Sequence, residues 1–411
     1  MKRLVVCCDG TWGTESNPTV SNIVKIAESV RLSTSRDTGE HVGQRVFYTD
    51  GPGSRGYRLD KWLGGAFGLG LDAALATMYW QVALNWEEGD EIFIFGFSRG
   101  AFTARSLAGM INRLGLLTPD ALIDKAYPQA LAIYRERKAH PDDPDPPEWA
   151  AFRERYCTPS VPIKFLGVFD TVGAMGVPGI TTHRYRFHDL RLSPIVHCAR
   201  QALAIDERRR VYQPCLWEIT DEDGVRRQRP DRVEQVWFTG CHGDIGGGNA
   251  DSRLSDTTLR WMIREAQVQG LEFDAGRLAR IFGTPAGDAA AGAVSGDGGD
   301  RPATGTGPAL PNQTLTVGYR LLNLLGLLVN PGNPRFYRDA WRRLDTPDDR
   351  KIYLSSSVTT GPEYDPPNVR RWERELDGTP PTVRVPGPEA FDPPPRPTVV
   401  SPVELPAPAR T

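Results

Sequence analysis

The sequence predicts a three-layer α/β fold with a mostly parallel central sheet and helical insertions. Short apolar runs alternate with segments of helical period, a pattern typical of buried parallel strands joined by crossover helices. Four of these runs end directly in polar loops, which follow Cys8, Phe95, Phe169 and Thr239. Because ligands bind at the carboxyl ends of strands in such sheets, these loops are expected to meet at the functional edge.

The expected elements follow the apolar pattern in chain order. Each strand is a short apolar run, and each helix repeats its apolar residues with the helical period. The predicted strands cover residues 3–8, 45–49, 92–95, 163–169, 211–218 and 234–239. The predicted helices cover residues 22–31, 71–85, 101–111, 195–209 and 255–269.

Residues 90–105 form the stretch around which the rest of the prediction is organised. They predict a buried strand, a very tight turn and a helix, and residues 96–100 fit the pattern G-x-S-x-G. The glycines allow a strained strand-to-helix turn that holds a serine hydroxyl above the sheet edge. This pattern predicts Ser98 as a catalytic nucleophile, and an ordinary Gly-Ser turn is the alternative.

Two further residues complete the arrangement that a serine nucleophile needs. A serine hydroxyl requires a neighbouring base, and the base requires an orienting carboxylate. Asp170 and His242 each follow a predicted strand, and the order Ser98, Asp170, His242 is that of the α/β-hydrolase fold. We expect His242 to act as the base and Asp170 to hold its imidazole. A structural turn aspartate is the other interpretation of Asp170.

The loops nearest the predicted nucleophile supply candidates for an oxyanion hole. The backbone N–H of Arg99 follows the serine and is the expected first donor. The second donor should come from an early loop, where Gly10 and Thr11 are the candidates.

Asp9 and Asp244 are expected to support the site, and they also define the main rival chemistry. That rival is a metal-dependent hydrolase with Asp9, His242 and Asp244 as ligands, although no H-E-x-x-H motif accompanies them. The predicted arrangement of Ser98, His242 and Asp170 requires no metal and no cofactor. Residues 51–56 match G-x-G-x-x-G but include Pro52, so they predict a glycine-rich rim of the cleft in preference to a nucleotide site.

The bulk composition excludes several classes of protein. The chain has 411 residues and a formal net charge of −2, so no nucleic-acid partner is expected. The six cysteines form no C-x-x-C pair, which is typical of reduced thiols. The start of the chain lacks signal-peptide features, and no apolar run approaches the roughly 20 residues of a membrane span. A cytoplasmic protein is therefore expected.

Changes in composition divide the chain into four parts. A catalytic domain with two insertions is followed by a Gly- and Ala-rich linker, a helical C-terminal segment and a Pro-rich disordered tail. These parts cover residues 1–285, 286–312, 313–377 and 378–411, with the insertions near 119–160 and 178–232.

Six long motifs add a family resemblance to this interpretation. They cover residues 5–12, 96–105, 165–173, 202–209, 236–248 and 254–263. Together they resemble a bacterial and fungal α/β-hydrolase family described as the catalytic domain of type VI secretion phospholipase effectors of the first lipase class. The resemblance implies a serine hydrolase with Ser98, Asp170 and His242 in the roles given above. Gly243 stands where the family often has serine.

The sequence leaves two functions of different classes. The first is a serine ester hydrolase, which the resemblance implies to be a lipase or phospholipase acting on glycerophospholipid acyl esters. The second is a non-catalytic binding or adaptor protein that keeps the hydrolase fold. For the enzyme, the expected partners are a lipid or small ester and, transiently, a membrane surface. The resemblance leaves open a secretion-system or immunity partner and export by a non-classical secretion route.

Overall fold

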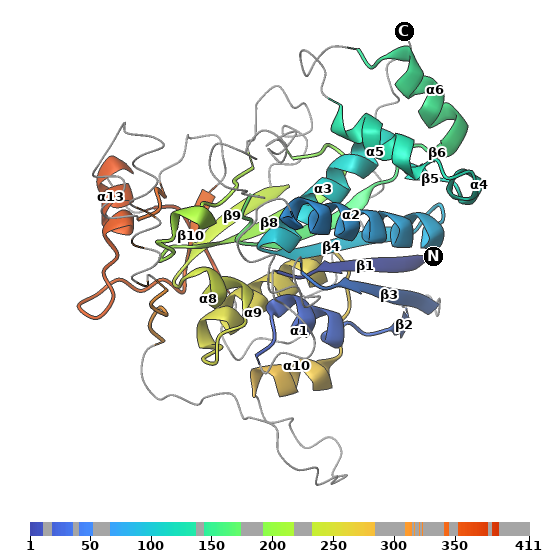
Figure 1. Ribbon diagram of the computed structural model, residues 1–411. Coiled ribbons are helices and arrows are strands. Elements are labelled where there is room, and N and C mark those ends of the chain that lie inside the picture. The colour runs from blue at the N-terminus through green and yellow to red at the C-terminus, as the bar shows by residue number, and fades with distance from the viewer. Residues whose placement is uncertain are drawn as a thin grey trace.

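The computed structural model has one large sheet with helices on both faces (Figure 1). The structure describes residues 1–10, 19–35, 41–51, 66–136, 144–173, 192–217, 232–283, 309–314, 316, 320, 323, 341–344, 352–376 and 380–385.

Within these residues the central sheet has nine strands in the order β11-β10-β9-β8-β7-β4-β1-β3-β2. Neighbouring strands are parallel, except that β2 runs antiparallel to β3. The predicted fold class is therefore confirmed. The strands are β1 Lys2–Cys8, β2 Ser33–Ser35, β3 His41–Thr49, β4 Glu91–Phe97, β7 Ile163–Phe169, β8 Val196–Ala204, β9 Val233–Phe238, β10 Ile352–Ser355 and β11 Thr382–Val383.

The order of strands reverses at β1, and this reversal places the site. From β1 the chain moves outward to β3 and then returns to β4 on the other side of β1. Such a reversal leaves a crevice beyond the carboxyl ends of the two strands that flank it, where α/β proteins bind ligands. Asp9 directly follows β1 and Ser98 directly follows β4, so both residues belong to this crevice.

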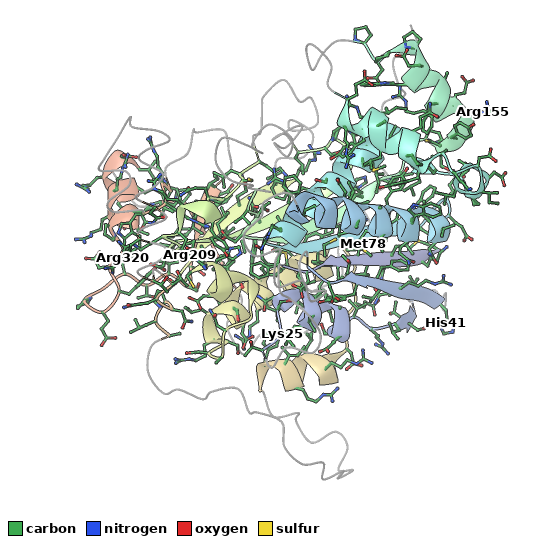
Figure 2. The ribbon with its side chains drawn as sticks, viewed as in Figure 1. Lys25, His41, Met78, Arg155, Arg209 and Arg320 are labelled. Carbon is green, nitrogen blue, oxygen red and sulfur yellow. The ribbon has the colours of Figure 1, made fainter. Side chains whose placement is uncertain are left out.

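Helices cover the two faces of the sheet through two separate cores. Leu4 and Val6 of β1 pack on one face with α2 and α3, whereas Val5 packs on the other face with α1 and α9. This alternation follows from the period of two along a strand. Figure 2 labels Met78 of α2 and Lys25 of α1 on opposite sides of the sheet. The bounds are α1 Asn22–Ser29, α2 Ala66–Asn85, α3 Arg99–Leu114, α9 Arg253–Val268 and α10 Ala275–Phe282.

A helical insertion follows α3 and lies beyond the sheet in Figure 1. Its described residues form three helices and the two-stranded sheet of β5 and β6. Its elements are β5 Leu116–Leu117, α4 Pro119–Ile123, α5 Tyr127–Arg135, α6 Pro147–Tyr156 and β6 Cys157–Thr158. None of the helices in the described part of the chain has the length and apolar character needed to span a bilayer.

Strand β8 corrects two of the sequence-based predictions. The helix predicted at 195–209 is wrong, and the insertion predicted near 178–232 contains this central strand between β7 and β9. Its polar residues obscure the strand pattern because they are buried and bonded to neighbouring elements. Arg200 donates to Glu265 at 2.6 Å, and Gln201 donates to Gln235 at 2.9 Å. The strand predicted at 211–218 is wrong as well, because described residues 210–217 hold only the short 3₁₀ helix η2, Arg210–Tyr212.

The C-terminal segment predicted to be helical at 313–377 contributes a strand to the sheet as well as a helix. β10 pairs with β9, β11 pairs with β10, and α13 (Pro367–Leu376) lies between the two strands in sequence. Val385 is buried beyond β11. The disordered tail predicted from residue 378 is therefore wrong for 380–385. The linker at 286–308 and the chain from 386 lie outside the described residues.

Candidate active site

Ser98 lies in a sharp turn between β4 and α3. Its φ of 56° and ψ of −119° belong to a region that L-residues rarely adopt, as expected for a strained nucleophile turn. Its backbone N–H donates to the carbonyl of Phe169 at 3.0 Å, and its own carbonyl accepts from Phe102 at 3.3 Å. These bonds hold the turn against the end of β7 and the first turn of α3.

Gly100 allows this turn to lie against the end of β1. A Cβ atom at Gly100 would lie 2.2 Å from the backbone carbonyl oxygens of Cys8 and Asp9. Such a contact is impossible for real atoms, so the second glycine of the motif is required by close packing of backbone on backbone.

Replacing Gly100 with alanine is expected to lower the free energy of unfolding by about 1–3 kcal/mol or more, because neither buried backbone can move aside. Thermal or denaturant unfolding measures the effect. Gly43→Ala on β3 is the matched control, since no atom lies within 4 Å of its added Cβ. Equal unfolding midpoints for the Gly100 and Gly43 variants would show that the close approach is not a constraint.

Three side chains from separate strand ends meet beside this turn. Nε2 of His242 lies 2.8 Å from Oγ of Ser98, and its Nδ1 lies 2.6 Å from Oδ2 of Asp170. Ser98 is 4% exposed, His242 is 6% exposed and Asp170 is fully buried. The structure thus brings the three predicted residues into one buried hydrogen-bonded chain.

The imidazole of His242 contacts two aromatic rings. The centroid of the Phe97 ring lies 4.8 Å from the centroid of the imidazole. The centroid of the Tyr212 ring lies 4.7 Å from it, and these two rings pack edge to face. The backbone N–H of His242, at the start of α8 (His242–Gly246), donates to Glu207 at 3.2 Å. The imidazole is therefore held by the hydrogen bonds of its two nitrogens to Ser98 and Asp170 and by these two aromatic contacts. The sequence did not single out Tyr212, whereas Glu207 belongs to the motif at 202–209.

Besides His242, Asp170 has a charged partner, Arg342, which sequence reasoning missed. Arg342 donates to both carboxylate oxygens, to Oδ1 at 2.6 Å and to Oδ2 at 2.9 Å. Burial alone would raise the pKa of Asp170, but the Arg342 guanidinium and the bond to His242 hold that pKa well below its usual value. No local pattern around residue 342 indicates this role, since the pair is separated by 172 residues.

The early loop is organised around Asp9. Its carboxylate accepts from the backbone N–H of Gly10 at 2.6 Å, from Ser21 at 2.8 Å and from Tyr48 at 2.8 Å. Burial raises the pKa of Asp9 above its ordinary value, although these three bonds oppose the shift. The Gly10 N–H is thus bonded to Asp9 in this state. Thr11 lies outside the described residues.

Asp244 bonds to a different set of partners from His242. Its two oxygens accept from the side chains of Asn249 and Asn312 at 2.6 Å and from the backbone N–H groups of Cys241 and Asn312 at 3.0 Å. Asp9, His242 and Asp244 therefore each bind separate partners. Across the part of the chain that the structure describes, no three His, Cys, Asp or Glu side chains gather as a metal-binding group.

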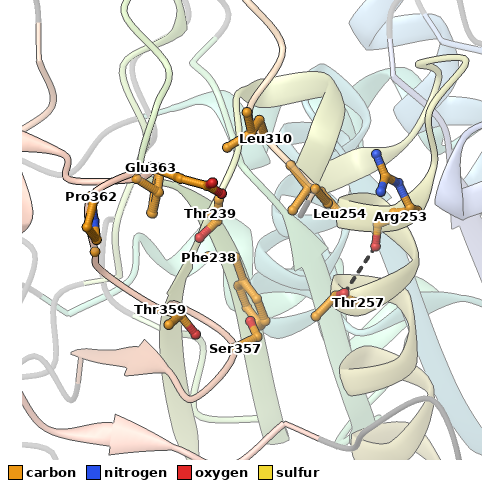
Figure 3. A pocket seen from close by; sticks show the side chains of 13 residues that line it. Phe238, Thr239, Arg253, Leu254, Thr257, Leu310, Ser357, Thr359, Pro362 and Glu363 are labelled. Atoms are coloured by element: carbon orange, nitrogen blue, oxygen red, sulfur yellow. Dashed lines mark hydrogen bonds between the residues drawn. The ribbon is translucent and has the colours of Figure 1, made fainter. Parts of the chain in front are cut away.

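A cavity of about 600 Å³ lies at the carboxyl end of β9 (Figure 3). Its wall combines Thr239 after β9 and Leu254 of α9 with Leu310 and Tyr364 from the C-terminal segment. The three residues of the hydrogen-bonded chain do not line it. Tyr364 also donates to Asp206 at 2.8 Å. Burial raises the pKa of Asp206 to about 6.

Comparison with protein families gives one match across most of this architecture. Residues 2–265 match the family model described as "T6SS, Phospholipase effector Tle1-like, catalytic domain". An uncharacterized protein of Saccharomyces cerevisiae is 30% identical over 227 residues, which are 51% of this chain and 31% of that protein. The chain thus spans about a third of the length of this curated relative.

Solved structures give more distant likenesses. The Tle1 effector bound to the VgrG spike of the type 6 secretion system is 18% identical, with a TM-score of 0.34, over 62% of this chain and 52% of that one. An uncharacterized protein from Pseudomonas aeruginosa is 18% identical, with a TM-score of 0.35, over 66% and 46% of the two chains. Esterase 2 of Thermogutta terrifontis is 12% identical, with a TM-score of 0.27, over 63% and 79%.

Proposed function

Because the chain belongs to the family of Tle1-like catalytic domains of type VI secretion phospholipase effectors, we propose that it is a serine ester hydrolase. One observation carries the proposal. The hydrogen-bonded chain from Ser98 through His242 to Asp170 joins the carboxyl ends of β4, β9 and β7 at 2.8 Å and 2.6 Å. Nucleophile, base and orienting carboxylate in this contact are the components of serine-dependent acyl transfer.

In the proposed reaction, His242 removes the Ser98 proton through Nε2 as Oγ attacks the ester carbonyl. The resulting imidazolium then protonates the leaving alcohol, and an acyl-serine remains. A water molecule, deprotonated by the same nitrogen, then attacks the acyl carbon. As the bond between the acyl carbon and Oγ breaks, the imidazolium returns this proton to Oγ, and the carboxylic acid is released. Asp170 accepts the Nδ1–H bond throughout and stays ionised, since its pKa lies well below the usual value.

Negative charge on the ester oxygen requires backbone donors. The Arg99 N–H at the start of α3 is the proposed first donor, because it follows the nucleophile at the positive end of the helix. The Gly10 N–H is the proposed second donor. Since it donates to Asp9 at 2.6 Å, it must exchange that partner for the oxyanion when substrate binds.

The proposed substrates are acyl esters of glycerophospholipids. The family description supports this class, and a substrate of this kind implies transient contact with a lipid surface. We also propose a secretion-system or immunity partner, and only the family match supports it.

Release of fatty acid from mixed phospholipid vesicles by the purified protein tests the substrate class. We expect measurable release by wild type, faster than hydrolysis of soluble short-chain esters, and none by Ser98→Ala. If the protein hydrolyses soluble esters but not phospholipids, the proposed serine mechanism is supported and the proposed phospholipid substrate is rejected. Absence of both turnover and labelling by a fluorophosphonate probe would reject the enzyme in favour of a binding protein on the same fold.

A further inference from the structure

The active-site chain of hydrogen bonds receives a residue from the C-terminal segment. Arg342 is 2% exposed and lies outside residues 2–265, which match the family model. Its two terminal nitrogens donate to the two oxygens of Asp170, at 2.6 Å and 2.9 Å. A bidentate pair of this kind fixes the plane of the carboxylate as well as its position.

The same guanidinium also bonds to two backbone carbonyls. It donates to Ala204, at the end of β8, at 3.0 Å and to Tyr212, whose ring contacts His242. Leu344 packs two residues further on in a core with Leu203. Arg342 is therefore held in place by its own neighbours and joins the β7, β8 and η2 parts of the site.

Apart from the bonds to Arg342, each oxygen of the Asp170 carboxylate has one described contact. Apart from Arg342, its carboxylate accepts from the backbone N–H of Ala204 at 3.2 Å and contacts Nδ1 of His242 at 2.6 Å. Without the guanidinium, each carboxylate oxygen keeps one of these two contacts, and the bidentate pair that fixes the carboxylate plane is lost. Rotation would move Oδ2 away from the imidazole.

We infer that Arg342 is a positioning residue of the triad, so that the C-terminal segment completes the active site of this chain. The inference rests on the proposed serine mechanism. No described contact joins Arg342 to the nucleophile or to the base; it acts through Asp170 and supports, by its bond to the Tyr212 carbonyl, the residue whose ring contacts His242.

The charge of Arg342 also predicts a signature in the pH profile. The positive guanidinium of Arg342 partly neutralises the carboxylate of Asp170, which also contacts His242. Removing the guanidinium therefore strengthens the attraction between this carboxylate and a protonated His242. Protonated imidazole cannot accept the Ser98 proton, and the acidic limb of kcat/KM should therefore move to higher pH. Three other charged groups lie near His242 in the fold: Glu207 accepts from its backbone N–H, Arg209 lies over the ring of Tyr212, and Asp244 follows it on α8. Such a variant retains all three, although Arg342 also helps to lower the pKa of Glu207.

The test compares Arg342→Gln and Arg342→Lys with wild type in the full chain, using a soluble ester or a fluorophosphonate probe. For Arg342→Gln we expect kcat to fall about 100-fold with KM little changed, and the acidic limb to rise by about one pH unit. Arg342→Lys should keep the limb near its wild-type position but recover only part of kcat, because an ammonium cannot bind both oxygens.

Tyr364→Phe is the matched control. It removes another bond between the C-terminal segment and the end of β8, to Asp206, without touching the triad. We expect its kcat/KM and pH profile to remain near wild type. An effect on kcat equal to that of Arg342→Gln would show that general docking of the segment, and not positioning of Asp170, is responsible.

A folded Arg342→Gln protein with wild-type kcat and an unmoved limb would overturn the inference. If that variant does not fold, a folded Arg342→Lys protein with wild-type kcat would overturn it equally. These outcomes differ from failure of the proposed function, in which wild type itself shows neither turnover nor labelling of Ser98.

Discussion

Replacing Ser98 with alanine is expected to reduce kcat/KM by about 10⁴-fold or more and to abolish labelling by a fluorophosphonate. The hydroxyl lies 2.8 Å from Nε2 of His242 and is the only serine oxygen bonded to that ring among the described contacts. Alanine keeps the Cβ atom and the backbone geometry. The fold and the unfolding midpoint should therefore change little.

Backbone strain provides a control for the Ser98 variants. Glycine adopts a φ of 56° without the steric penalty that serine and alanine share. Ser98→Gly should accordingly be inactive and at least as stable as Ser98→Ala in thermal unfolding. Equal ester turnover by wild type and Ser98→Ala, with folded protein in both cases, would remove Ser98 from the mechanism.

Replacing Asp170 with asparagine is expected to reduce kcat/KM by about 10⁴-fold, the loss known for the aspartate of the serine-protease triad. An amide replaces one carboxylate oxygen by an NH2 group, which cannot accept the bond that Arg342 donates to Oδ1 or those that Arg342 and His242 make to Oδ2. It also leaves the buried guanidinium without a counter-charge, which should lower the free energy of unfolding by about 3–5 kcal/mol. Probe-labelling rates, corrected for the folded fraction from circular dichroism, measure the catalytic part.

Asp206→Asn is the matched control for this variant. Asp206 is a half-buried carboxylate at a strand end, but it accepts from the Gly240 N–H at 2.7 Å and from Tyr364, and an amide oxygen can do the same. We expect its kcat/KM to stay within a few-fold of wild type. The reverse result, with Asp206→Asn inactive and Asp170→Asn active, would assign the orienting carboxylate to Asp206.

The strands with continuous apolar runs could be predicted from the sequence because burial on both faces leaves a local mark. β1, β4 and β7 each carry such a run, and β9 carries a shorter one over its last three residues; their order with the intervening helices was enough to predict a parallel sheet. The glycines around Ser98 similarly indicated a tight turn. At Gly100 the structure gives the reason, because an added Cβ atom would lie 2.2 Å from the carbonyl oxygens of Cys8 and Asp9. These features depend on residues close together in the chain.

Strand β8 and the C-terminal strands were decided by tertiary contacts. Val196–Ala204 contains His, Arg and Gln in positions that only neighbouring elements satisfy, such as Glu265 for Arg200. β10 and β11 are short and gain stability by pairing with an existing edge, so their own residues carry little signal. In a buried segment, such contacts outweigh the intrinsic secondary-structure propensity of its residues.

The candidate site divides in the same way. Its strand-end loops and the order Ser98, Asp170, His242 were readable from the sequence, because parallel strands end at one edge. The contact of Asp170 with Arg342 was not readable, since a buried ion pair depends on where two segments 172 residues apart are placed by the whole sheet. A lone arginine in sequence has no period or motif, and its charge becomes informative only where the fold removes it from water beside a carboxylate.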